Sequence, residues 1–254
     1  LRLLDGHGFT IDYIWNYAQA PASIIHPEDL WMPLASVLAA IPQAFYRTAE
    51  GVFNPLSLLP FMLLGSLLPL VAFWGARLLR IGDGAALYAA AATAVIPELV
   101  LNSVRTDTTI PTAVFVGVAV LAFVKGVRDG GAGWMVLAGV MSGLAYLTRN
   151  DALLLLPGYL VFAIVAWWAG RRGWTERPHL RWALLAPLVM LLVVTPWLAR
   201  NARELGMLSA PETSKMFFFS DNLDHYAFDR EFTLDTLLAA KTPAELIGKR
   251  LFEL

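Results

Sequence analysis

The sequence predicts an all-α protein that crosses a membrane several times. Of its 254 residues, 57% are hydrophobic and 15% are charged, whereas soluble domains are about half apolar and a quarter charged. The apolar residues form long runs, and a helix needs roughly 20 such residues to cross the hydrocarbon. The charged residues lie mostly between these runs. We therefore expect a polytopic bundle of transmembrane helices, with extracytoplasmic loops that carry helices lying on the membrane.

Six apolar runs are candidates for membrane spans, in order about 53–79, 84–101, 109–126, 133–148, 152–169 and 182–199. The runs at 133–148 and 152–169 are short. They predict a hairpin whose tip lies at, or slightly inside, the membrane interface. The stretch 31–46 is too short to span, but its apolar residues fall on one helical face. We expect a helix that lies along the membrane surface there.

Positive charge distinguishes two sets of loops. One set carries Arg77, Arg80, Lys125, Arg128, Arg171, Arg172, Arg177 and Arg181, and the other carries Arg105, Arg149, Arg200 and Arg203. Loops on the cytoplasmic side are richer in Lys and Arg, so the first set is expected to face the cytoplasm. The acidic residues Asp5, Asp12, Glu28, Asp29, Asp107 and Asp151 then lie on the outer face.

We divide the chain into three parts on this basis. Residues 1–50 form a first extracytoplasmic loop with a surface helix, 51–199 form the transmembrane bundle, and 200–254 form an extracytoplasmic loop with helices. The tail contains two plausible helical stretches, 233–240 and 243–254. The chain begins with Leu and ends on "GKRLFEL", which we interpret as a piece of a longer protein that lacks spans at both ends.

Several classes of chemistry are excluded or unsupported. The chain has 0 Cys, so thiol chemistry and disulfides are absent. Its 4 His residues are scattered, with no pair at metal-ligand spacing on one helix. No basic block indicates a nucleic-acid partner. No metal site is predicted from these patterns.

The acidic segment at the start of the chain is the first candidate site. Partial desolvation at an apolar surface raises the pKa of a carboxyl group toward the working pH and makes it a general base. Asp5, Asp12 and Glu28 are the candidates for this role, with Tyr13 as a substrate-binding neighbour. A divalent cation held by these carboxylates is one alternative. A solvated loop is another.

Two further candidates are Arg–x–Asp phrases at span ends. Arg105 and Asp107 precede one span, and Arg149 and Asp151 form the tip of the short hairpin. Ionisable groups at this depth are costly and often functional. The alternatives are structural. Asp107 caps a helix start, Arg105 extends to the headgroups, and Asn150 or Asp151 caps the next helix.

The last candidates follow the final span. Arg200, in "PWLARN", has the planar guanidinium that binds phosphate oxygens through two parallel donors; the alternative is an interfacial anchor. In the tail, Asp221 and Asp224 follow three consecutive Phe residues. Aromatic rings and acids of this kind can contact a sugar, so we expect them to close over a substrate near Asp5. The alternative is a loop that only shields the span ends.

Five phrases resemble those of the GT-C-fold membrane glycosyltransferases, a group that includes the protein O-mannosyltransferases and the bacterial lipid A aminoarabinose transferases. The phrases run along almost the whole chain in family order: "DGHGFTIDY", "PEDLWMPLASVLAA", "VRTDTTIPTAV", "GLAYLTRNDALLLLPG" and "PWLARNARELG". Two departures stand out. Gly6 replaces a second acidic residue, and Asn150 replaces the usual Pro.

The resemblance implies transfer of a sugar from a polyprenyl-phosphate donor to an acceptor hydroxyl on the extracytoplasmic face. The acceptor would be a lipid, glycan or protein, and the membrane would be the bacterial inner membrane. Asp5 would be the base, and Arg105, Arg149 and Arg200 would contact the phosphate. Asp107 and Asp151 would contact the substrate. The resemblance leaves open whether the reaction also uses a divalent cation.

Two other functions are weighed against this one. A transporter or flippase would use broken helices and charges at mid-span. Apart from Glu98, however, the spans carry charge only at their ends, at Arg77 and Lys125. A non-catalytic subunit that binds a lipid-linked sugar would share every feature listed above except turnover.

Overall fold

The computed structural model describes residues 3–11, 25–28, 31–46, 54–173 and 178–208. They belong to two compact units, one of Leu1–Trp31 with Leu198–Leu254 and one of Met32–Trp197. Each unit is considered by itself. Asp12, Tyr13, Asp221, Asp224 and the two expected tail helices lie outside the described residues, and the three-part division of the chain stays a prediction.

The larger unit is all-helical, as the apolar runs predict. Its elements are α1 (Pro33–Phe45), η1 (Pro55–Leu58), α2 (Leu59–Leu78), α3 (Asp83–Ala94), α4 (Pro97–Ser103), α5 (Thr109–Asp129), α6 (Ala132–Thr148), η2 (Asn150–Leu154), α7 (Leu155–Arg171), η3 (Leu180–Trp182) and the first part of α8 (Leu185–Glu204). Among the residues that the structure describes, four continuous helical segments are long and apolar enough to cross a membrane, namely Pro55–Leu78, Thr109–Asp129, Asn150–Arg171 and Leu180–Glu204. The chain is an all-α polytopic membrane protein.

Two expected spans differ from their prediction. The run at 84–101 forms α3 and α4, which meet at a bend of 56°. The bend lies where Pro97 begins α4, because proline lacks an amide donor and keeps the residue before it extended. The run at 152–169 is not short, since η2 and the last turn of α7 extend it to Asn150–Arg171, 22 residues. Of the two helices predicted to be short spans, only α6, with 17 residues, is short.

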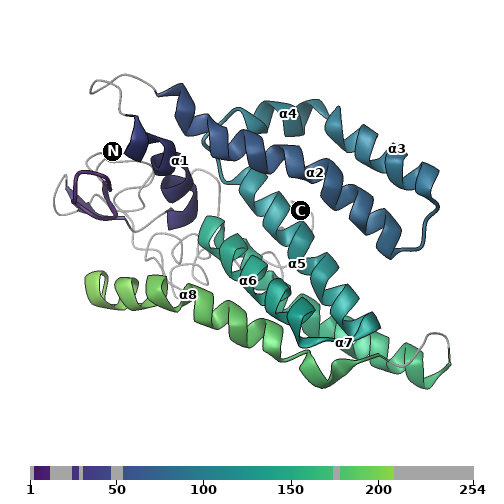
Figure 1. Ribbon diagram of the computed structural model, residues 1–254. Helices are drawn as coiled ribbons and strands as arrows, with labels where there is room; N and C mark the ends of the chain where they lie inside the picture. The colour runs from purple at the N-terminus through teal and green to yellow at the C-terminus, as the bar shows by residue number, and fades with distance from the viewer. Residues whose placement is uncertain (1–2, 12–24, 29–30, 47–53, 174–177, 209–254) are drawn as a thin grey trace, which may run out of the picture. The chain divides into compact units, whose positions relative to one another are not determined.

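Helix α5 is the centre of the larger unit. One side of α5 packs against α2 and another against α6, while α4 and α7 also contact it, and Figure 1 shows α2 and α5 side by side. Ile110, Ala119 and Ala122 of α5 are fully buried. Gly117 lets α5 approach Val71 of α2, because a Cβ there would lie 2.8 Å from a Val71 methyl. Small residues permit this close packing of helices in membranes.

Helices α6 and α8 approach each other even more closely. A Cβ on Gly139 would lie 2.5 Å from the Ala186 carbonyl oxygen, and one on Gly143 would lie 2.6 Å from Val193. Only glycine fits at these two positions. The contact fixes the position of α6, whose last residues lead into the Arg149 turn.

The two ends of the bundle differ in charge. One end, the basic end, carries Arg77, Arg80, Lys125, Arg128, Arg171, Arg172 and Arg181. There Arg128 donates to the Leu78 carbonyl at 2.8 Å, and Lys125 pairs with Asp129 at 2.7 Å. The other end, called the Arg149 end, contains the start of α5 and the turn between α6 and η2. Charge is thus confined largely to the helix ends, as the loop pattern predicts.

The expected surface helix is present as α1. Leu34 packs against the core cluster formed with α5 and α6, whereas Ile41 and Phe45 are exposed. An exposed apolar face at the end of a bundle suits a helix that lies on a membrane. Its depth in the membrane stays a prediction.

The first prediction concerns the α6–α8 contact. Gly139→Leu should destabilise the protein by about 1–3 kcal/mol, since the new side chain overlaps the Ala186 carbonyl and Val189. Gly133→Leu, in the same helix, is the matched control because nothing lies within 4 Å of a Cβ there. Thermal unfolding of both variants in detergent measures the difference. Equal melting temperatures would contradict this packing.

Candidate functional site

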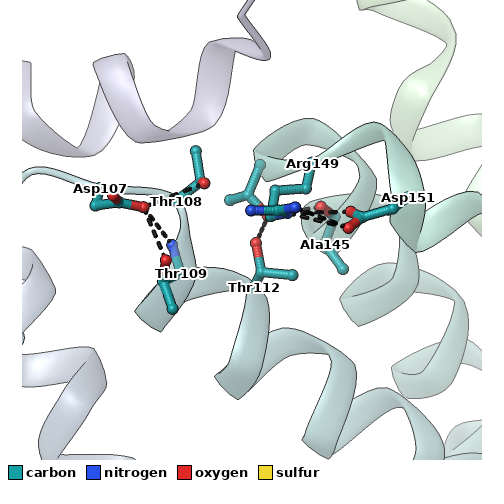
Figure 2. A network of polar contacts seen from close by, with 8 residues as sticks. Asp107, Thr108, Thr109, Thr112, Ala145, Arg149 and Asp151 are labelled. Carbon is teal, nitrogen blue, oxygen red and sulfur yellow. Dashed lines mark hydrogen bonds and ion pairs between the residues drawn. The ribbon is translucent and has the colours of Figure 1, made fainter. Parts of the chain in front are cut away.

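Asp107 lies at the start of α5 and is held by threonines. Its carboxylate accepts hydrogen bonds from the Thr109 amide at 2.8 Å, the Thr109 hydroxyl at 2.9 Å and the Thr108 hydroxyl at 3.3 Å (Figure 2). Partial desolvation raises the pKa of Asp107, but the hydrogen bonds from Thr109 and Thr108 outweigh it and lower the pKa below its ordinary value. Asp107 is therefore ionised at neutral pH. The structural alternative, a cap on this helix, is observed.

Arg149 and Asp151 form a forked ion pair in the turn between α6 and η2. The Arg149 Nε donates to both carboxylate oxygens, at 3.2 and 3.1 Å, and Nη2 donates to one of them at 3.0 Å (Figure 2). The side chains are 48% and 54% exposed, so the pair contributes little to stability. Asp151 is engaged by Arg149 and does not cap η2, which has no side-chain cap.

This geometry leaves part of the Arg149 guanidinium available. Its Nη1 has no acceptor among the described residues, and it carries two N–H groups. The hydrogen bonds and charge of Asp151, together with the charge of Asp107, raise the pKa of Arg149, although desolvation opposes this. Arg149 is therefore cationic at any working pH. Asp151 fixes its orientation while Nη1 can still donate to a ligand.

A threonine pair ties the two halves of this site together. The hydroxyls of Thr112 in α5 and Thr148 in α6 lie 2.8 Å apart, and Thr148 also donates to the Ala145 carbonyl at 2.6 Å. Thr148 is 1% exposed. This buried link holds the start of α5, with Asp107, against the end of α6, with Arg149. Figure 2 shows the three charged side chains at this one end of the bundle.

An apolar groove of about 470 Å³ begins at the same place. Thr112 and Asp151 line one end of it, and its walls are side chains of α5 on one side and of η2 and α7 on the other. The Arg149 end thus combines fixed charges with an apolar cavity. Small-molecule sites are usually apolar cavities with a few polar groups that orient the ligand.

Arg105 is the fourth predicted residue of this unit. Its side chain is exposed and makes no ion pair or hydrogen bond with another described residue. It follows α4 and lies two residues before Asp107. The structure therefore keeps it available for an anion without assigning it one.

The smaller unit contains Asp5, Glu28 and Arg200. Strands β1 (Thr10–Ile11) and β2 (His26–Pro27) pair antiparallel, and Asp5 lies in the turn that precedes them. Arg200 donates to the Phe9 carbonyl at 2.8 Å and the Glu28 carbonyl at 2.7 Å. The carboxylate of Glu28 accepts from the Trp31 amide at 2.7 Å. Arg200 thereby joins the two strands to α8, and a role for it in phosphate binding stays a prediction.

In the described parts of the chain, no group of three or more His, Asp or Glu side chains is arranged to hold a metal ion.

The chain was compared with known protein families, curated proteins and solved structures. Residues 38–199 match the model of the dolichyl-phosphate-mannose-protein mannosyltransferase family. The chain belongs to this family. The comparisons with curated proteins and with solved structures found no match.

Membership in the mannosyltransferase family agrees with the resemblance inferred from the five phrases. It indicates a membrane glycosyltransferase of the mannosyltransferase kind that uses a polyprenyl-phosphate donor. The matched segment contains Arg105, Asp107, Arg149 and Asp151 but neither Asp5 nor Arg200. The Arg149 end is therefore the part of the candidate site that the family match covers.

Sequence reasoning missed three features of the larger unit. These are the Thr112–Thr148 pair, the apolar groove, and a buried hydrogen bond of 2.6 Å between Ser142 and Tyr159. The signal for the first was the run of threonines around Asp107 together with the Thr that precedes Arg149. These threonines lie next to the two charged phrases. Hydroxyl groups inside a membrane bundle form hydrogen bonds with each other because no water reaches them.

Proposed function

We propose that the chain carries the donor-phosphate site of a glycosyltransferase that moves mannose from a polyprenyl phosphate to an acceptor hydroxyl. The observation that supports this most directly is the Arg149 side chain. Its guanidinium is oriented by Asp151, its Nη1 has no acceptor among the described residues, and Asp151 itself lines one end of an apolar groove. A lipid-linked phosphate needs a cation and a hydrocarbon cavity side by side.

Arg149 has a defined role in this reaction. As the bond between the anomeric carbon and the phosphate oxygen breaks, negative charge develops on the leaving polyprenyl phosphate. A guanidinium already held in place stabilises that charge without reorganising. Asp151 and Asp107 place two carboxylates beside it, and these can accept hydrogen bonds from sugar hydroxyls. They also keep the local charge from trapping the anionic product.

Asp5 is the proposed base. The acceptor oxygen attacks the anomeric carbon, its proton passes to the carboxylate, and the polyprenyl phosphate departs as an anion. No general acid is needed because the leaving group is already stable as an anion. The acceptor is a lipid, glycan or protein hydroxyl, and Asp12 and Glu28 are the alternatives to Asp5.

The Arg149 end is proposed to face away from the cytoplasm. The basic end carries most of the Arg and Lys residues of the described loops, and such loops remain on the cytoplasmic side. In a bacterium this places the site on the outer surface of the inner membrane, where a lipid-linked donor replaces nucleotide sugars.

The second prediction tests Arg149. In the intact protein, Arg149→Ala should lower the rate of mannose transfer from polyprenyl-phosphate mannose by about 10²–10³-fold, since a preorganised donor to the leaving group is lost. The rate of Arg149→Lys should lie between those of the wild type and Arg149→Ala, because lysine keeps the positive charge but lacks the planar guanidinium that donates two parallel hydrogen bonds. Arg80→Ala, at an exposed arginine of the basic end, is the control. Release of polyprenyl phosphate measures all three, and wild-type rates in Arg149→Ala would reject the assignment.

The third prediction tests the base. Asp5→Asn should lower kcat by about 10²–10⁴-fold and leave donor binding intact. His7→Ala, in the same turn, should retain activity. Equilibrium binding of radiolabelled donor is measured beside turnover. Unchanged turnover in Asp5→Asn would assign the role of the base to Asp12 or Glu28. If the wild type binds the donor but shows no turnover, the chain is a non-catalytic subunit.

The fourth prediction tests the orientation. These 254 residues contain 0 Cys, so labelling of each variant is compared with labelling of the purified protein that lacks the introduced thiol. Thr106→Cys, at the Arg149 end, should react with a membrane-impermeant maleimide in intact cells. Gly82→Cys, at the basic end, should react only after permeabilisation. The reverse pattern would place the site on the cytoplasmic side.

A further inference from the structure

Helix α7 ends in two cation–π pairs of tryptophan and arginine. The Arg171 Cζ lies 4.6 Å from the centroid of the Trp167 ring, and the Arg172 Cζ lies 4.1 Å from that of Trp168. In each pair the residues are four apart, so they are neighbours on the helix surface. The ring supports one face of the guanidinium, while the N–H groups point outward from its edge. Arg171 makes no hydrogen bond or ion pair with another described residue, so its donors are available to a ligand.

An open cavity of about 640 Å³ lies beside the first of these pairs. Its described lining residues are Trp167, Gly170, Arg171 and Pro178. The segment that follows Pro178 is fixed to the bundle, because the His179 amide donates to the Val127 carbonyl at 2.8 Å. Leu180 also packs against the core cluster that α5, α6 and α7 share. The two walls of the cavity therefore belong to parts of the larger unit that are held in place.

Positive charge exceeds negative charge around this cavity. Arg181 lies three residues beyond the cavity wall, and its Cζ is 5.5 Å from the centroid of the Trp182 ring. The two described acids of the basic end, Asp83 and Asp129, form ion pairs with other cations. Among the described residues, no carboxylate is thus left to neutralise Arg171 or Arg181. Oriented N–H donors and excess positive charge are the two features that bind a phosphate.

The cavity lies at the membrane interface opposite to the Arg149 end. The span Asn150–Arg171 has 22 residues and is about 33 Å long at the rise of an α-helix, which matches the ~30 Å of the hydrocarbon. Between Trp167 and the middle of this span, Val161, Ile164 and Val165 are exposed. In a bilayer these side chains meet hydrocarbon. A ligand here has its phosphate beside arginines and its chains along α7, which is the chemistry of a phospholipid.

We propose that this cavity binds the headgroup of an anionic phospholipid from the membrane leaflet at the basic end. Arg171 donates to the phosphate oxygens, Trp167 orients the guanidinium, and Arg181 adds attraction at longer range. The acyl chains lie along the exposed apolar face of α7. A zwitterionic headgroup binds less tightly, because its ammonium group adds a positive charge beside the arginines. The site is separate from the proposed donor site and does not depend on the proposed function.

A bound lipid can be distinguished from general anchoring at the interface. Tryptophan and arginine also anchor membrane proteins with no specific lipid, and every exposed arginine of the basic end then contributes through its charge. A headgroup site depends instead on the arginine that lines the cavity. Arg80 is the matched control, because it is exposed at the basic end like Arg171 but does not line the cavity.

Native mass spectrometry of the intact protein in detergent tests the proposal, with phosphatidylglycerol and phosphatidylcholine of the same acyl chains as probes. The wild type should bind phosphatidylglycerol more tightly than phosphatidylcholine. Arg171→Gln should weaken phosphatidylglycerol binding by roughly tenfold, since it removes a hydrogen bond to a charged group. Trp167→Leu should weaken it less, because it removes only the ring that supports the guanidinium. Arg80→Gln should match the wild type. Melting temperatures without added lipid check that each variant is folded.

Three results would overturn the proposal. Equal affinities of the wild type for the two lipids would show that the anionic headgroup is not recognised. An equal loss in Arg80→Gln and Arg171→Gln would indicate general anchoring rather than a site. Competition by glycerol 3-phosphate with the affinity of the lipid would indicate a site for a soluble phosphate ester. Should Arg171→Gln fail to fold, Trp167→Leu decides, and unchanged phosphatidylglycerol binding in that variant overturns the proposal.

Discussion

The absence of water in the hydrocarbon interior is the constraint from which the rest of this structure follows. Backbone amides must bond within their own helix, and ionised side chains must lie at helix ends or be paired. The chain obeys both conditions in its larger unit. Arg77, Lys125 and Arg128 gather at one end with their acidic partners, and Asp107, Arg149 and Asp151 gather at the other. The site is thus a consequence of where charge is tolerated.

The same constraint explains how the site is held. Its charged groups stand on the ends of α5 and α6, and the positions of those helices are set by close contacts in the membrane. Gly117 brings α5 to α2, Gly139 brings α6 to α8, and the Thr112–Thr148 hydroxyl pair joins α5 to α6. Asp151 then orients Arg149 by a forked contact that contributes little to stability. A guanidinium so oriented keeps one nitrogen for a ligand, and an apolar groove lined by Asp151 begins at the same end of the bundle.

Sequence reasoning predicted the helices well, because length and apolarity alone decide which runs cross a bilayer. It also singled out Asp107, Arg149 and Asp151 as charged residues at span ends, and the structure brings the three to one end of the bundle. Their roles stay predictions. It did not anticipate the 56° bend at Pro97, since a proline in a membrane helix is tolerated or not according to its neighbours. It took 152–169 as short because the polar Asn150 and Asp151 ended the apolar run, whereas η2 continues the helix through them.

Sequence reasoning could not predict which residues far apart in the chain contact each other. The charge of Arg200 suggested an anion, but the structure gives this side chain the Phe9 and Glu28 carbonyls, 191 and 172 residues away. The Thr112–Thr148 pair is separated by 36 residues, so the threonines near each charged phrase do not by themselves show that the two hydroxyls meet. The groove likewise depends on how α5 and α7 pack. Such features arise from tertiary contacts, which a single sequence does not show.

The central claim is that the donor phosphate binds at the Arg149 end of the bundle. An experimental structure of the intact protein with a non-transferable polyprenyl-phosphate analogue tests it most directly. The account predicts phosphate density within hydrogen-bond distance of the Arg149 Nη1. Density for the phosphate of this analogue at the basic end, beside Arg171 or Arg128, would contradict it.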